Sequence, residues 1–101
     1  MNHVQLLGRL EEVNQRWTPD GSLSVVASLY IVRPKQGALR ASEADEQPLP
    51  LRGLGEVAQS MVEHAGQQVY VEGLLRRRYY RQDGVERWGQ VEIWAQKCCA
   101  A

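Results

Sequence analysis

The chain has 101 residues, which is enough for one domain with a modest hydrophobic core but not for two domains. Hydrophobic residues make up 44% of it, which excludes the composition typical of a disordered chain. Its 12 basic and 12 acidic residues cancel, so any argument for a polyanionic partner must come from where the charges lie.

The first half of the chain predicts two strands joined by a turn. Alternating apolar residues predict a strand over Val4–Leu10, which either continues through Glu11–Arg16 or ends there in a loop. Thr18–Gly21 contains the Pro, Asp and Gly residues that favour a turn. The β-branched run Leu23–Val32 predicts the second strand.

The middle of the chain predicts a loop, a short strand and a helix. Arg33–Pro48 is rich in Pro, Ala and acidic residues, which predicts a long mobile loop, and Leu49–Leu51 predicts a third strand. A helix is expected over Gly55–His64, because apolar residues recur there at helical spacing. The predicted apolar stripe consists of Leu54, Val57, Ala58, Met61 and Val62.

The last third predicts a long hairpin. Its strands are expected over Gln68–Arg78 and Val85–Ala95, with a turn at Gln82–Gly84. The resulting order of three strands, one helix and two strands is that of the OB-fold, a five-stranded Greek-key barrel with its helix between the third and fourth strands. We therefore predict a mainly β protein whose residues 1–101 form a single OB-fold domain.

Residues 76–81 form the segment that points most clearly to a function. They comprise four arginines and two tyrosines, without an acid. Because side chains alternate along a strand, Arg76, Arg78 and Tyr80 are expected on one face and the other three on the opposite face. Arginine neutralises phosphate, and a tyrosine ring stacks on an unpaired base. The segment therefore predicts binding of single-stranded nucleic acid.

Two other interpretations fit the same residues. A long hairpin also uses aromatic cross-strand partners covered by arginine stems, with Asp83 and Glu86 available to pair with arginines. Tyrosine, tryptophan and arginine also dominate protein–protein hot spots. Ten of the twelve basic residues are arginine, which suits phosphate recognition but also follows from a GC-rich genome.

The sequence lacks an arrangement typical of catalysis or metal binding. His3 and His64 are its only histidines, and neither has a nearby partner at metal-ligand spacing. The adjacent Cys98 and Cys99 are poorly placed to bridge each other. No apolar run is long enough to span a membrane, and the first residues lack signal-peptide features. We expect no enzyme activity, no metal or cofactor, no membrane contact and a cytoplasmic location.

The chain resembles the bacterial single-stranded DNA-binding protein family over nearly its whole length. The segments that carry the resemblance are Met1–Val4, Leu7–Leu10, Trp17–Gly21, Gly53–Ala58, Gly66–Arg78, Gly84 and Arg87–Trp88. The resemblance implies an OB-fold that binds single-stranded DNA without chemistry, associates with the nucleoid and assembles as a homodimer or homotetramer. Single-stranded RNA stays open as a ligand, because stacking surfaces do not distinguish the sugar.

The resemblance and the residues together predict two surfaces. The expected DNA-binding residues are Trp17, Arg33, Lys35, Arg52, Arg76, Arg78, Tyr80, Arg81, Arg87 and Trp88. The expected subunit interface consists of His3, Val4 and Leu6, since exposed strand edges seek partners.

The chain also departs from the family pattern. Tyr80 matches one stacking aromatic of the family, but three other such positions fall at or near Lys35, Glu46 and Arg52. This implies binding weighted towards phosphate contacts, with a steep salt dependence. The sequence ends without the acidic tail that recruits repair enzymes. The nearest alternative is therefore the primosomal replication protein N group, with an OB-fold that mainly docks replication-restart proteins.

Overall fold

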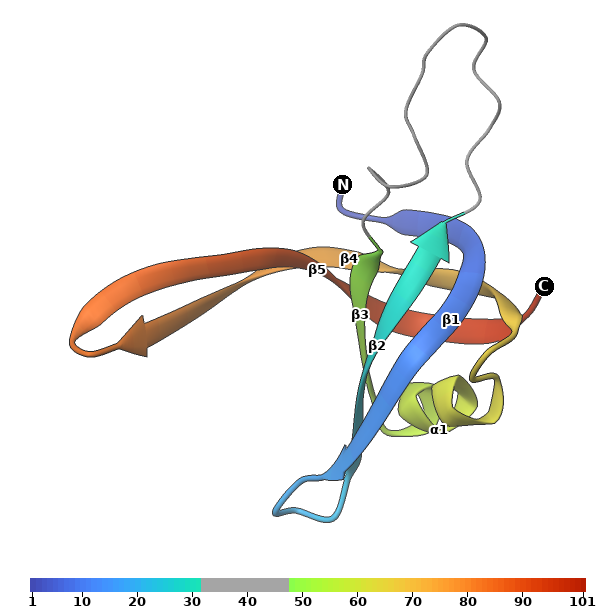
Figure 1. Ribbon diagram of the computed structural model, residues 1–101, viewed down its shortest axis with the longest axis horizontal. Coiled ribbons are helices and arrows are strands. Elements are labelled where there is room, and N and C mark those ends of the chain that lie inside the picture. The colour runs from blue at the N-terminus through green and yellow to red at the C-terminus, as the bar shows by residue number, and fades with distance from the viewer. Residues whose placement is uncertain (32–47) are drawn as a thin grey trace, which may run out of the picture.

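The computed structural model describes residues 1–31 and 48–101 of the chain. Its elements are β1 (Val4–Trp17), β2 (Leu23–Ile31), β3 (Leu49–Leu54), α1 (Glu56–Glu63), β4 (Gln68–Gln82) and β5 (Val85–Ala100) (Figure 1). The strands close into a barrel in the order β1-β2-β3-β5-β4. The β3–β5 pair is parallel and the other four are antiparallel. This is the OB-fold arrangement, and the predicted fold class is confirmed.

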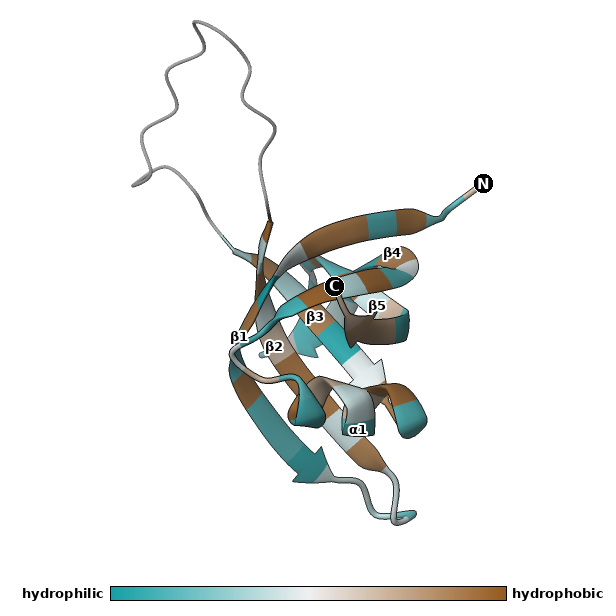
Figure 2. Cartoon of the chain, turned by 90° about the vertical axis from the view of Figure 1, so that its right-hand side faces the viewer, coloured by the Kyte–Doolittle hydropathy of each residue, from teal (hydrophilic) through white to brown (hydrophobic). Residues whose placement is uncertain are grey.

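The barrel interior is filled by alternate side chains of the strands, and Figure 2 shows apolar and polar residues alternating along them. The fully buried strand residues include Leu10, Val25, Leu29, Leu51, Val69, Val71 and Ile93. Each such side chain contributes roughly 1.5–3 kcal/mol through burial. The outward residues of the same strands are therefore held on a rigid frame.

Helix α1 packs against β1, β2, β3 and β5. Its Ala58 and Met61 are fully buried, which confirms Met61 as a core residue. The helical assignment of Leu54 was wrong, because Leu54 is the last residue of β3 and is 48% exposed. Within residues 1–31 and 48–101, no helix is long and apolar enough to cross a membrane.

β1 follows the longer of its two predicted extents, and β3 is longer than predicted. β1 continues to Trp17 through a bulge between Glu11 and Asn14, where Glu12 has a φ of 53°. β3 runs on from Leu51 to Leu54, so the predicted third strand was too short. The bulge lets β1 bend while it keeps its pairing with β2, so this one strand pairs with both β2 and β4.

The β4–β5 hairpin extends well beyond the barrel (Figure 1). Its strands reach Gln82 and Ala100, so the strands predicted to end at Arg78 and Ala95 were too short. The turn residues Asp83 and Gly84 have φ values of 53° and 77°, as a two-residue type I′ turn requires. The arginine- and tyrosine-bearing residues 76–81 therefore lie on an arm that projects from the barrel.

Candidate nucleic-acid interface

One outward face of the sheet gathers basic residues from four strands. Leu51 and Ile93 point into the core, so their neighbours Arg52, Glu92 and Trp94 point outwards. The register places Arg52 on β3 directly beside Trp94 on β5. We call this surface the arginine face, and it comprises Arg16, Arg52, Arg76, Arg78, Tyr80, Arg87, Glu92 and Trp94.

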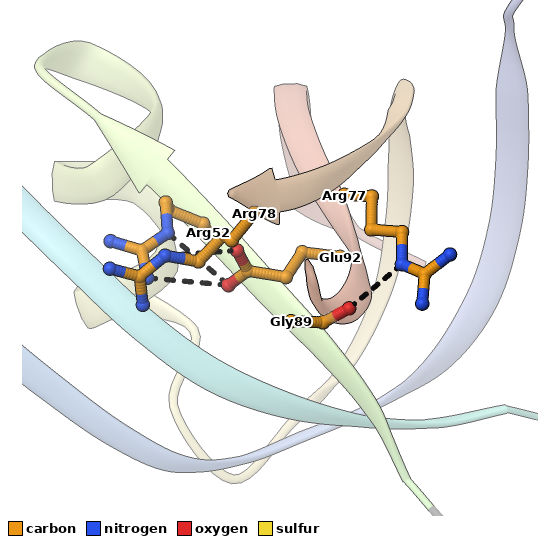
Figure 3. Close-up of polar contacts among 5 residues, drawn as sticks. All are labelled: Arg52, Arg77, Arg78, Gly89 and Glu92. Carbon is orange, nitrogen blue, oxygen red and sulfur yellow. Dashed lines mark hydrogen bonds and ion pairs between the residues drawn. The ribbon is translucent and has the colours of Figure 1, made fainter. Parts of the chain in front are cut away.

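Glu92 is the acid at the centre of the arginine face. Its Oε2 accepts hydrogen bonds from Nε and Nη2 of Arg52, both at 3.3 Å. Its Oε1 lies 3.7 Å from Nε of Arg78 (Figure 3). Arg77 points to the opposite side of the hairpin and donates to the carbonyl of Gly89 at 3.0 Å. Glu92 thus orients one arginine from β3 and one from β4 towards the same surface.

The two arginines that Glu92 contacts differ in how much charge they present to solvent. The Arg52 side chain is 18% exposed and the Arg78 side chain 58% exposed, whereas Glu92 is almost fully buried. Removing one partner of a buried pair is costly, because the other charge stays buried alone. Arg52 therefore holds Glu92 in place, and Arg78 keeps donors free to face a ligand.

Trp94 lies between two guanidinium groups of the arginine face. The Arg76 guanidinium is 4.4 Å from the centre of the indole ring, and that of Arg52 is 5.7 Å away. Cation–π contacts of this kind hold the arginines over the ring. Trp94 and Glu92 were not among the residues predicted from the sequence. The usable signal was their alternation with buried Ile93, which places both on one outward face.

A groove of about 550 Å³ crosses the arginine face. Three of its lining residues are arginines, three are neutral hydrogen-bonding residues, and none of those in the described part of the chain is an acid. The lining consists of Asn14, Gln15, Arg16, Ser24, Val26, Arg52 and Arg78. Guanidinium groups bind phosphate bidentately, so the chemistry of this groove suits a phosphate backbone.

A smaller cleft of about 260 Å³ adjoins the groove and shares Arg78 with it. The cleft is lined by Pro50, Arg78, Tyr80, Gly89, Gln90 and Glu92. Tyr80 is 42% exposed, and a Cβ on Gly89 would lie 3.4 Å from its ring. Arg87 is exposed and pairs across the hairpin with Tyr80. This end of the arginine face thus combines an open aromatic ring with cations on both sides.

On the opposite face of the hairpin, the side chains contact one another. The rings of Tyr79 and Trp88 are 4.9 Å apart, and Nη2 of Arg81 lies 3.2 Å from Oε1 of Glu86. A hydrogen bond to Glu86 raises the pKa of Tyr79. The same bond, together with Arg81, lowers the pKa of Glu86. The predicted split of the segment between two faces is confirmed, and this second face matches the structural-hairpin interpretation.

Several predicted binding residues are not brought to the arginine face. Trp88 lies on the opposite side of the hairpin with Tyr79, as does Arg81. Trp17 is 67% exposed but pairs with Leu23, whose side chain is buried in the core, so it faces away from Arg16. The predictions for Arg33, Lys35 and Glu46, and for most of the 33–48 loop, lie outside the described residues.

The predicted subunit interface is only partly accessible. β1 pairs with β4 over Val4–Arg9, so one edge of this segment is occupied within the chain. Leu6 packs against the core, whereas His3 is exposed and precedes β1. Pairing with β2 begins at Gly8, which leaves the second edge of the first β1 residues without a partner strand among the described residues. The homodimer or homotetramer stays a prediction, which light scattering at micromolar concentration tests.

Comparison with known proteins adds no family to this picture. No family model matches the chain, and no curated protein matches it. The resemblance to single-stranded DNA-binding proteins therefore stays a prediction. The grounds for a functional proposal are the OB-fold and the geometry of the arginine face.

Proposed function

We propose that this chain binds single-stranded DNA through the arginine face, in replication, recombination or repair, and catalyses no reaction itself. The observation that carries the proposal is the groove with three arginines and no described acid, adjoining a cleft with an exposed Tyr80 ring. Arginines suit a phosphate backbone, and the ring suits an unpaired base.

The neighbouring groove and cleft favour a single strand over a duplex. In a duplex the bases stack on one another and are paired, so none is free to lie on Tyr80. A single strand can place its backbone in the groove and turn a base into the cleft beside it. Because a tyrosine ring stacks on any base, we expect no strong sequence preference overall.

The test is a titration of a fluorescent oligo(dT) of about 12 nucleotides, within the site size of one OB-fold, at low and moderate salt. A duplex of equal length and an RNA strand of equal length serve as comparisons. Trp94 is the tryptophan on the arginine face, so binding should quench its fluorescence, and Trp94→Phe should remove most of the quenching. A protein that binds no oligonucleotide at low salt would refute the proposal.

A second candidate is docking of a replication or restart protein. The side of the hairpin opposite the arginine face exposes four large apolar residues: Leu75 by 46%, Tyr79 by 51%, Trp88 by 60% and Val91 by 50%. Aromatic surfaces of this kind are common at protein interfaces. Capture of a purified replication protein that is lost in Trp88→Ala, together with no oligonucleotide binding, would select this function instead.

A further inference from the structure

The cleft beside Tyr80 contains a buried hydrogen-bond acceptor that the rest of the site does not use. Glu92 is 5% exposed, and its Oε1 has no hydrogen-bond partner among the described residues. Buried polar atoms nearly always have a partner, and leaving one unsatisfied costs free energy. In the described part of the chain, Nε of Arg78 lies 3.7 Å from this oxygen, beyond hydrogen-bonding distance, and Arg52 bonds the other oxygen of the carboxylate.

The charges in the cleft do not suit a phosphate. A carboxylate repels an anion, and Glu92 lines this cleft with its Oε1 3.7 Å from Nε of Arg78. The groove next to the cleft has no acid among its described lining residues, so the backbone is better held there. The cleft therefore suits a neutral group that donates a hydrogen bond.

The geometry of the cleft fits a nucleobase. Tyr80 provides an exposed ring, and Gly89 leaves the space next to that ring free of a side chain. Gln90 adds an amide that can donate or accept. Arg78 lines both the groove and the cleft, so a backbone in the groove brings a base to the mouth of the cleft.

We infer that this cleft selects, at one nucleotide position, a base with an exocyclic amino group, cytosine or adenine, whose amine donates to Oε1 of Glu92. The inference rests on the proposed function. Carboxylates accept hydrogen bonds from the cytosine amino group in other nucleic-acid complexes. The ring N–H of thymine stands between two carbonyl oxygens, which would face the carboxylate. Binding thus tolerates any base but is tighter when the cleft holds an amino base.

The experiment compares oligo(dC) with oligo(dT) of equal length, at neutral pH and fixed salt, on the wild-type chain. We expect oligo(dC) to bind about fivefold to tenfold more tightly. A third oligonucleotide, built from a cytosine analogue without the exocyclic amine, should bind as weakly as oligo(dT). This arm needs no variant, so it does not depend on whether a substitution disturbs folding.

Two variants then assign the preference to the cleft. Glu92→Gln should bring the ratio of the oligo(dC) and oligo(dT) affinities to about one, because an amide accepts and donates equally well. Glu86→Gln removes the same charge from the opposite face of the same hairpin and should keep the wild-type ratio.

The outcomes separate the inference from the proposed function. Equal affinity for the three oligonucleotides would overturn the amino-base inference and leave single-strand binding intact. A preference that survives Glu92→Gln in a folded variant would overturn the role of Glu92. Failure of the wild-type chain to bind any of them at low salt would overturn both proposals.

Discussion

Replacing Arg78 with glutamine separates phosphate binding from base stacking. Four exposed arginines lie on the arginine face: Arg16, Arg76, Arg78 and Arg87. For single strands, each phosphate contact contributes about 0.7 to the slope of log affinity against log salt concentration, so four contacts give a slope of about −2.8. Affinity should then fall about fiftyfold between 50 and 200 mM salt. The buried, Glu92-paired Arg52 is left out of this count.

In Arg78→Gln the slope should fall to about −2.1, and the loss over the same salt range to about eighteenfold. Fluorescence anisotropy of a labelled oligo(dT), measured at four or more salt concentrations, gives both slopes. Arg81→Gln is the matched control, because Arg81 lies on the same strand but pairs with Glu86 on the opposite face. An unchanged slope in Arg78→Gln, or an equal decrease in Arg81→Gln, would refute the assignment of phosphate contacts to the arginine face.

Three further predictions concern stacking, packing and pH. Tyr80→Ala should weaken oligonucleotide binding by about 1–3 kcal/mol at every salt concentration, without changing the slope of log affinity against log salt concentration. Tyr79→Ala should leave the affinity unchanged, and an equal loss of affinity in both variants would contradict the prediction. Gly73→Ala should lower the unfolding free energy by about 1–3 kcal/mol or more in a denaturant titration, because its Cβ would overlap the carbonyl oxygen of Trp94; a wild-type midpoint would argue against that close approach. Burial raises the pKa of Cys98 from 9.0 to about 11, so this thiol ionises in the unfolded chain at a lower pH than in the folded one. The unfolding free energy should therefore fall by about 2 kcal/mol as the pH rises from 9 to 11. Cys98→Ala should lack this loss, and parallel pH profiles of the variant and the wild type would contradict the prediction.

The order of the elements was predictable from the sequence because it depends on local patterns. Three local patterns are each visible within a few residues: the β-branched run Leu23–Val32, the helical spacing that includes Met61, and the Asp83–Gly84 turn. The length of β1 was left open by the sequence, which allowed an end at Leu10 or a continuation through Arg16. Its extension depends on a bulge at Glu12, a residue that gives no sign of a positive φ.

Only part of the candidate site was predictable from the sequence, because its central residues come together through the pairing of β3 with β5. The strand alternation correctly placed Arg76, Arg78 and Tyr80 on one face. The role of Arg52 depends on the β3–β5 pairing, which brings it to Glu92 and Trp94 across 40 residues of sequence. Local patterns carry no information about which strands pair at that distance, so nothing in the sequence singled out Glu92.

The parallel contact between β3 and β5 has a consequence for the motions of the barrel. It is registered at only two residue pairs, Leu51 with Ile93 and Arg52 with Trp94, whereas each antiparallel pair is registered over six or more. Local opening follows the least supported contacts, so this is where the ring should come apart first. A single-stranded DNA bound in the groove, which is lined by Arg52 of β3 on one side of this contact and Arg78 of β4 on the other, would hold the two sides together. Hydrogen exchange of β3 and β5 amides should therefore slow on binding more than exchange elsewhere in the barrel.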